Sequence, residues 1–452
     1  MKRVLLISPL APTSLMGGKD FFFRLPNLGM LRVASLTPSD WELKMVDEKV
    51  EPLQLDQLEA DIVGITAMTP TVKRAYEIAA HFRARGIKVI MGGMHVTQLP
   101  EEAMAHCDSV IVGEAELLWP QALRDFEQGA LKPLYRHENG LPSLLHLPPL
   151  DRELFRKKNY LPVHFVETTR GCPLDCEFCA VTTSFGGAYR TRTLDEVMDE
   201  VRALRWFEGG PLTLKNLILF VDDNIVANRT YARELFTRLA DLKWRWFAQT
   251  SMNIAKDTEL LRLCQRSGCM GFFMGFETLS QDTLNAIGKK VNHPEFYREA
   301  VQKIHDHGIG IDASFVFGFD TDELSVMDRT LEFVLANKIE IAHFSILTPY
   351  PGTRVFKRFK EQGRLLTEDW NYYDGGRVVY RPKNFTTDQL QEGYYRTLQA
   401  CYGPSGIFKR LWGTSSFWRF FLPMNMAFQG GVNKLASNWR KGAMRLPESS
   451  LS

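Results

Sequence analysis

Short apolar runs alternate with helical patterns along the first third of the chain. These runs predict strands at residues 4–7, 43–46, 62–66, 89–91 and 110–112. Such alternation is typical of an α/β unit with an open, mostly parallel sheet and helices on both faces, so we expect a doubly wound, Rossmann-like domain over residues 1–132. Ligands of such sheets bind at the carboxyl ends of the strands. Small and polar residues occupy those ends here and leave room for a ligand.

A stretch rich in Pro and Leu separates this unit from a second alternation. Pro142, Pro148 and Pro149 would interrupt any helix between residues 133 and 162, and we interpret that stretch as a linker. Beyond it, strands are expected at residues 164–168, 217–221, 245–250, 271–276, 311–317 and 341–347. Six strand–helix units of this kind predict a partial (β/α)6 barrel, which we place at residues 163–353.

The remaining residues, 354–452, are predicted to form a helical C-terminal region, with amphipathic stretches at 355–362 and 387–401. Between Ile407 and Phe428, seven aromatic side chains are interleaved with basic ones. This mixture suits a peripheral membrane contact or an apolar substrate. A helix that simply packs on the barrel is the alternative interpretation.

Composition and charge narrow the class of protein. Hydrophobic residues make up 45% of the 452 residues and charged residues 24%, which is ordinary for a globular protein. A net charge of +2 is too small to indicate a nucleic-acid partner. Seven cysteines, an odd number with three in one short stretch, favour a reduced cytoplasmic protein over a disulfide framework. No apolar stretch approaches the ~20 residues that cross a bilayer.

Three cysteines lie together in the loop after the first strand of the second unit. Cys172, Cys176 and Cys179 are separated by three and then two residues, so one short loop can direct all three thiols at an iron–sulfur cluster. Three thiolates leave one iron of a 4Fe-4S cubane free for a substrate or cofactor, as in an open catalytic metal site. A zinc site or a chance cluster of thiols is the alternative, but zinc normally takes a fourth Cys or His, and the other cysteines show no paired spacing.

With an aromatic residue before its last cysteine, this loop resembles the signature of the radical S-adenosylmethionine (SAM) superfamily. The resemblance implies that the three cysteines hold the catalytic 4Fe-4S cluster and that its free iron chelates the amino and carboxylate groups of SAM. Reduction would then cleave the sulfonium to methionine and a deoxyadenosyl radical. The SAM-binding residues that the resemblance implies are Phe178, Asp222, Asp223, Gln249, Gly275 and Glu277.

These strand-end residues have simpler interpretations as well. Asp222 and Asp223 would also serve as caps of the helix that follows them, and Glu277 would also serve as an ordinary acid in a first helical turn. From the residues alone, both interpretations stay open.

The first unit resembles the cobalamin-binding domain that precedes the radical SAM unit in a large subfamily. The cobalamin-binding residues that the resemblance implies are Thr66, Met68, Gly92, Gly93, His95, Gly113 and Glu114. The Asp-x-His-x-x-Gly loop, with which many cobalamin proteins place a histidine on cobalt, is absent from this unit. The lower axial face of the corrin is therefore unassigned, and His95 either contacts the corrin or caps its loop. A sheet that serves only as a scaffold is the alternative.

Together, the two resemblances imply a cobalamin-dependent methyltransferase of unactivated carbon. The overall pattern looks closest to members that methylate hopanoids or bacteriochlorophyll precursors, which implies a lipid-like or tetrapyrrole small molecule as substrate. A flavodoxin or ferredoxin would supply the electron. The alternatives are a radical SAM enzyme that catalyses cyclisation, oxidation or rearrangement without methyl transfer, and a non-catalytic cluster protein, which would need neither the barrel nor the strand-end acids.

Overall fold

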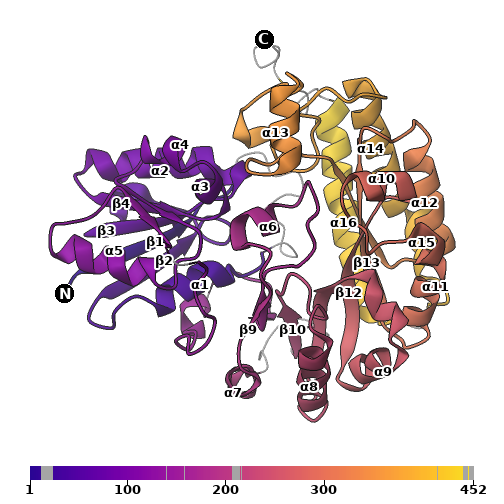
Figure 1. Cartoon of the computed structure of the whole chain (residues 1–452), viewed down its shortest axis with the longest axis horizontal. Coiled ribbons are helices and arrows are strands. Elements are labelled where there is room, and N and C mark those ends of the chain that lie inside the picture. Colours follow the sequence, from indigo (N-terminus) through magenta and orange to yellow (C-terminus); the bar gives the residue numbers. More distant parts are fainter. Residues whose placement is uncertain are drawn as a thin grey trace.

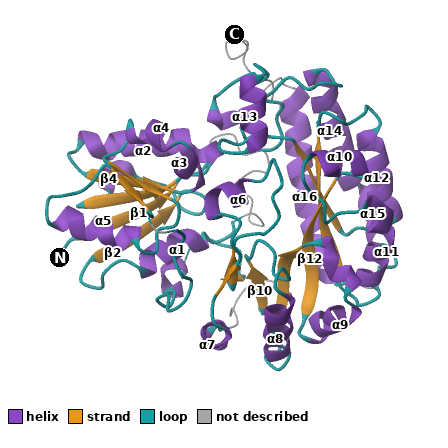
Figure 2. Cartoon of the chain, viewed as in Figure 1, coloured by secondary structure: helices purple, strands orange, loops and turns teal. Residues whose placement is uncertain are grey.

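The computed structural model describes residues 1–11, 24–138, 140–156, 158–205, 214, 216–414, 416–440 and 446. Two α/β units lie side by side, the first at the left of Figure 1 in indigo and the second at the right in magenta to yellow. The sheets of the two units are separate, and loops and the short helix α6 (Ala180–Phe185) lie between them (Figure 2).

The first unit is a parallel sheet covered by helices on both faces, as the sequence predicted. Its strands run in the order β2-β1-β3-β4-β5-β6. Their bounds are β1 (Arg3–Ser8), β2 (Glu42–Asp47), β3 (Ile62–Thr66), β4 (Lys88–Gly92), β5 (Ser109–Val112) and β6 (Leu134–Arg136). The helices are α1 (Leu28–Ser35), α2 (Val72–Ala84), α3 (Met94–Gln98), α4 (Pro100–Met104) and α5 (Leu118–Glu127). Leu5 and Ile7 belong to one core and Val4 and Leu6 to another, because alternate side chains of a strand face opposite sides of the sheet.

Strand β6 was not predicted, since it lies in the stretch that the sequence indicated as a linker. Only Tyr135 of its three residues is buried, so it lacks the apolar run that marks the other strands. It pairs with β5 through Val110–Leu134, Ile111–Tyr135 and Val112–Arg136. The first sheet therefore extends beyond residue 132, whereas the domain boundaries themselves stay predictions.

The second unit is the predicted partial barrel, with its strands in sequential order from β7 to β14 and all neighbours parallel. Its strands are β7 (His164–Val166), β10 (Leu217–Phe220), β11 (Arg245–Thr250), β12 (Cys269–Glu277), β13 (Gly310–Phe317) and β14 (Ile341–Ile346). A short antiparallel hairpin, β8 (Thr169–Arg170) with β9 (Arg190–Thr191), carries the cysteine loop. The helices are α7 (Leu194–Ala203), α8 (Arg229–Leu239), α9 (Thr258–Arg266), α10 (Gln281–Ala286), α11 (Pro294–His305) and α12 (Val326–Ala336).

The C-terminal region closes the foot of the barrel and also touches the first unit. Its helices are α13 (Arg354–Glu361), α14 (Thr387–Tyr402), α15 (Pro404–Leu411) and α16 (Trp418–Arg440). The segment around α13 crosses to the other unit: Phe356, Trp370 and Tyr373 are part of the first unit's core. Trp370 Nε1 donates to the Glu102 carboxylate of α4 at 3.0 Å, which ties the two units together on this side.

The aromatic residues of the last two helices fall into two groups. Phe420 and Phe421 are buried at the foot of the barrel against Phe247 and Gly310, which confirms the interpretation of a helix packed on the barrel for that part. Phe408, Trp412 and Trp418 are more than half exposed. Within the described part of the chain, no helix combines the length and apolar character that a bilayer crossing requires.

Candidate active site

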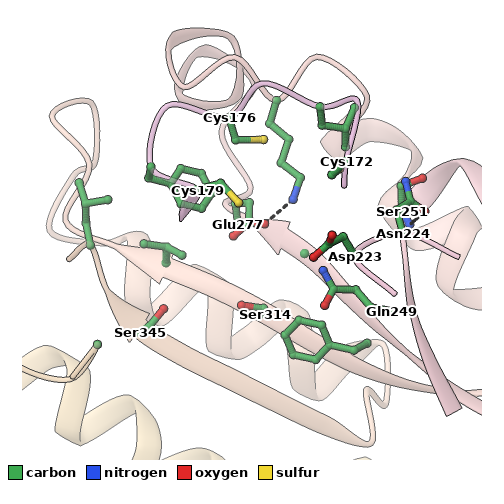
Figure 3. A pocket seen from close by; sticks show the side chains of 18 of the residues that line it. Cys172, Cys176, Cys179, Asp223, Asn224, Gln249, Ser251, Glu277, Ser314 and Ser345 are labelled. Carbon is green, nitrogen blue, oxygen red and sulfur yellow. Dashed lines mark hydrogen bonds and ion pairs between the residues drawn. The ribbon is translucent and has the colours of Figure 1, made fainter. Parts of the chain in front are cut away.

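A cavity of about 320 Å³ opens at the carboxyl ends of the barrel strands and collects most of the residues predicted to act there. The predicted residues in its lining are Cys172, Cys176, Phe178, Cys179, Asp223, Gln249, Gly275 and Glu277. Figure 3 shows the three cysteines along one wall, with Asp223 and Gln249 below them and Ser314 and Ser345 on the neighbouring strands. Residues from six different elements and loops therefore meet at one place.

The cysteine loop is held in shape by contacts on both sides. The backbone N–H of Glu177 donates to the Ile287 carbonyl at 3.0 Å, and the Glu177 carbonyl accepts from the N–H of Val355 at 3.3 Å. Arg358 forms an ion pair with the Glu177 carboxylate, and Arg354 with Asp175 at 2.6 Å. Because helix α13 supplies all three of the latter contacts, it braces the loop directly.

The donor set fits an iron–sulfur cluster. The three thiols line one wall, while the other cysteines of the chain are buried in the hydrophobic cores, away from the cavity. Among the described residues, no three His, Cys, Asp or Glu side chains gather closely enough to hold a single metal ion. Burial raises the pKa of the Cys176 thiol to about 11 and also raises those of Cys172 and Cys179, so cluster assembly must displace protons from them.

A buried ion pair that the sequence did not predict lies beside the thiols. The Lys289 ammonium contacts the Glu277 carboxylate, and both side chains are almost fully buried. Burial opposes the charge of Lys289, yet the Glu277 carboxylate raises its pKa above the ordinary value. Lys289 follows α10 in a loop, and nothing in its local sequence distinguishes it from a surface lysine.

Glu277 adopts a backbone conformation that is rare for a residue with a side chain, with φ of 65°. Its carboxylate folds back over Gly275, where an added Cβ would lie 2.1 Å from Oε1. The strand end beneath is anchored by Asn292, whose side-chain amide donates to the Gly275 carbonyl at 2.8 Å. Gly275 thus acts by leaving space for the ion pair.

The two neighbouring aspartates play different parts. Asp223 lines the cavity and accepts a hydrogen bond from the Gly171 N–H at 2.9 Å, and burial raises its pKa. Asp222 does not line the cavity: its carboxylate is buried and accepts from the hydroxyls of Thr168 and Thr169 at 2.7 and 2.6 Å. Asp222 therefore supports the loop below the site, contrary to the cofactor contact suggested for it.

The opposite wall of the cavity carries no charge. It is formed by the ends of β13 and β14 and by the segment after them, with Ser314, Val316, Ser345, Leu347 and Tyr350 in the lining. Ser314, Val316 and Ser345 were not among the predicted site residues, because isolated Ser and Val positions in a strand carry no distinctive signal. Tyr350 also packs against the core of the first unit, so the cavity ends near the junction of the two units.

A second, smaller cavity of about 80 Å³ lies in the first unit at the carboxyl ends of β1, β3, β4 and β5. Of the predicted cobalamin-binding residues it is lined by Thr66, Gly92, Gly93 and Gly113. The sheet order changes direction between β1 and β3, which is where open α/β sheets bind ligands.

The lining of this cavity fits a flat apolar group or a slender tail because side chains are missing from it. A Cβ at Gly92 would project into the cavity and meet Ile111 only at 3.8 Å and beyond. A Cβ at Gly64 would lie 2.8 Å from Leu6 and 2.9 Å from Trp119. The space at the strand ends thus depends on glycine.

Three of the predicted cobalamin contacts lie outside this cavity. Met68 is 56% exposed beside it. His95 is buried, with its ring nitrogens 3.2 Å from Thr69 Oγ1 and 3.4 Å from the Glu102 carboxylate, and it meets Trp370 edge-on. Glu114 is buried in an ion-pair network with Arg170 and Arg190. His95 therefore packs against Trp370 of the C-terminal region, and Glu114 pairs with arginines of the barrel unit, and neither lines the cavity.

Comparison with known proteins matches each of the two units to a protein family. The Radical SAM superfamily model matches residues 166–334 and the B12 binding domain model residues 19–123. The chain is 34% identical to bacteriochlorophyllide d C-12(1)-methyltransferase of Chlorobaculum tepidum over 93% of this chain and 92% of that one. The chain belongs to the cobalamin-binding radical SAM family. Its cofactors are a 4Fe-4S cluster, SAM and cobalamin, and it is an enzyme.

Further relatives of this radical SAM enzyme carry related names. Bacteriochlorophyllide d C-8(2)-methyltransferase of Chlorobaculum tepidum is 31% identical over 79% of this chain and 81% of that one. Hopanoid C-2 methylase of Rhodopseudomonas palustris is 26% identical over 76% of this chain and 66% of that one. The solved structure of the radical SAM methyltransferase TsrM from Kitasatospora setae covers 98% of this chain and 99% of that one, with a TM-score of 0.66 and 15% identity. That likeness confirms the predicted arrangement of the two units.

Proposed function

We propose that this enzyme is a cobalamin-dependent C-methyltransferase that acts on an unactivated carbon of an apolar small molecule, in particular a tetrapyrrole. The observation that carries the proposal is that one cavity has two unlike walls, one with thiols and charges and one with uncharged apolar and hydroxyl side chains. The named methyltransferases of bacteriochlorophyllide d, which are similar over most of the chain, support the tetrapyrrole as substrate.

The thiol wall would hold the cluster and SAM. Cys172, Cys176 and Cys179 would bind the cluster, and Asp223 and Glu277 would face the polar parts of SAM. When bound, the cluster and SAM supply hydrogen abstraction from carbon, and cobalamin supplies the methyl group. The protein's own part is to fix these residues before substrate arrives, through the braces on the cysteine loop and the buried Lys289–Glu277 pair.

The uncharged wall would receive the substrate. Val316 and Leu347 offer apolar surface to a hydrocarbon group, and Ser314, Ser345 and Tyr350 offer hydroxyl donors to carbonyl or ester oxygens at its edge. Burial of this wall within the barrel also excludes water, which would otherwise quench a carbon radical. Because the cavity reaches the junction of the units, a bulky ring would need to insert only the substituent that is methylated.

The electron source and the cellular setting complete the proposal. A flavodoxin or ferredoxin would reduce the cluster, and a cytoplasmic setting suits thiols that must stay free to bind iron. The exposed Phe408, Trp412 and Trp418 support a peripheral membrane contact, through which the enzyme would reach apolar substrates.

The direct test follows a labelled methyl group. Anaerobically reconstituted enzyme would be incubated with methyl-labelled SAM, reductant, cobalamin and bacteriochlorophyllide d, and the product analysed by mass spectrometry. We expect label on cobalamin first and then on a carbon of the tetrapyrrole, with deoxyadenosine as co-product. Deoxyadenosine together with a ring-closed or oxidised, unlabelled product would contradict methyl transfer and support the alternative reaction, for which a 25% identical cyclase of magnesium-protoporphyrin IX monomethyl ester is a precedent.

A further inference from the structure

Two arginines face each other across the short hairpin that carries the cysteine loop. In the β8–β9 ladder, Arg170 is directly opposite Arg190, and both side chains are mostly buried. Like charges in this position destabilise a hairpin. Of these two arginines, Arg170 meets the Glu167 carboxylate of its own unit with two hydrogen bonds of 2.9 and 2.8 Å. Arg190 donates to the Pro142 carbonyl and, among the described residues of the barrel unit, forms no ion pair. The hairpin therefore carries two buried cations, of which one forms an ion pair with a described carboxylate of its own unit.

The missing negative charge comes from the first unit. Glu114 lies in the loop after β5, with its side chain 1% exposed, and bridges both arginines. Its Oε2 accepts from Arg170 at 2.6 Å and from Arg190 at 2.9 Å, and its Oε1 accepts from Arg190 again. Glu116 adds a second contact to Arg170 at 2.8 Å. Two carboxylates of the first unit thus pair with the hairpin of the barrel unit, and of these Glu114 contacts both arginines.

Both ends of this bridge adjoin a cofactor cavity. On one side, Glu114 lies between Gly113 and Ala115, which both line the cavity of the first unit. On the other side, Arg170 is followed by Gly171 and the cluster ligand Cys172. Gly171 is tightly fitted: a Cβ there would lie 2.2 Å from the Ala188 carbonyl oxygen. A shift of the loop after β5, which carries Glu114, would therefore move Arg170. Arg170 lies only two residues before Cys172, so the start of the cysteine loop would move as well.

We propose that Glu114 is a positioning residue through which occupation of the cobalamin cavity fixes the cysteine loop. A corrin or its tail against Gly92 and Gly113 would order the loop that follows β5, and the carboxylate of Glu114 would then hold Arg170 and Arg190 in place. This role explains why a buried acid adjoins the cobalamin cavity without lining it. The inference rests on the proposed assignment of the two cavities and not on methyl transfer.

Hydrogen–deuterium exchange tests this coupling without a substrate. Cluster-reconstituted wild-type protein would be compared with and without bound hydroxocobalamin, whose uptake is measured by absorbance after gel filtration. We expect cobalamin to slow exchange in peptides covering residues 169–191 by about tenfold, in addition to peptides around residues 92–115. Equal exchange of residues 169–191 in both states would overturn the proposal, and this comparison requires no variant.

Variants then assign the effect to the bridge. In Glu114→Gln, which keeps shape and removes charge, we expect cobalamin uptake and protection near residue 92 to persist while protection of residues 169–191 is lost. Glu114→Asp should restore part of that protection. Glu127→Gln, which breaks a half-exposed pair to Lys2 in the same unit, is the matched control and should behave as wild type. A merely stabilising role would speed exchange of the hairpin equally in both states, and full cobalamin-dependent protection in Glu114→Gln would contradict the proposal.

Discussion

The two cofactor cavities are built in opposite ways. The cavity of the barrel is made by side chains with chemistry of their own, namely three thiols, a carboxylate at Asp223 and the buried pair of Glu277 and Lys289. The cavity of the first unit is lined at the strand ends by residues without side chains, Gly92, Gly93 and Gly113. Cofactor binding in the barrel cavity should be lost when a side-chain group is removed, and binding in the cavity of the first unit should be lost when one is added. Either change should leave cofactor binding in the other cavity intact.

The largest expected effect is on the thiol wall. Cys176→Ala removes one of the three proposed cluster ligands, so we expect loss of the cluster's visible absorbance and a fall in deoxyadenosine formation of more than about 100-fold. Cobalamin uptake should be unchanged, since the sheet cavity contains no residue of this loop. Cys401→Ala, at a buried cysteine of the core, is the matched control and should keep the cluster. SAM cleavage that persists in Cys176→Ala would contradict the assignment.

The converse experiment fills the glycine cavity. Gly92→Val adds a branched side chain to the cavity lining at the end of β4, where a Cβ would meet Ile111 at a van der Waals distance of 3.8 Å. We expect the protein to fold and to bind its cluster, while cobalamin affinity, measured by titration with absorbance detection, falls at least about tenfold. In Gly430→Ala, an added Cβ meets nothing within 4 Å, which makes it the control. Unchanged affinity in Gly92→Val would place cobalamin elsewhere.

A smaller effect is expected when the buried pair is broken. Lys289→Met leaves the Glu277 carboxylate buried without its cation, which should lower the free energy of unfolding of the cofactor-free protein by about 3 kcal/mol at pH 7. Urea denaturation measures this change. Lys357→Met, at a side chain that is 80% exposed, should change stability by less than about 0.5 kcal/mol. If Lys289→Met lowered the free energy of unfolding by as little as Lys357→Met does, the Lys289–Glu277 pair would make no net contribution to stability.

The smallest effect concerns Asp222, which lies below the site. Burial raises its pKa to about 7, against the lowering effect of the Thr169 and Thr168 hydroxyls. Because the folded-state pKa lies above the unfolded one, this carboxyl's contribution to stability is present below about pH 4 and is lost as the pH rises to 7. Asp222→Asn should reduce the fall in unfolding free energy between pH 4.5 and 7.5 by on the order of 2 kcal/mol. The same slope in variant and wild type would contradict the raised pKa.

The same contrast explains what the sequence could predict. The cysteine loop and both sheets were predictable because thiol spacing and apolar alternation are local patterns, and Arg245–Thr250 agrees with the predicted strand at both ends. The positions of Lys289 and Ser345 in the cavity lining were not predictable, because they depend on which strands and loops come together in the folded protein. In the first unit, His95 and Glu114 had conspicuous polar side chains, yet the structure packs His95 against Trp370 of the C-terminal region and pairs Glu114 with Arg170 of the barrel unit. The cavity of the first unit is lined by glycines at its strand ends, so its most conspicuous polar residues did not mark the residues that line it.

Metal analysis of one preparation tests the central claim most directly. Anaerobically reconstituted wild-type chain, freed of unbound metal and cobalamin by gel filtration, should contain about four irons and about one cobalt. Cys176→Ala should retain the cobalt without the iron, and Gly92→Val the iron without the cobalt. Zinc in place of iron, or joint loss of both metals in either variant, would contradict the account of two independently built cofactor sites in one chain.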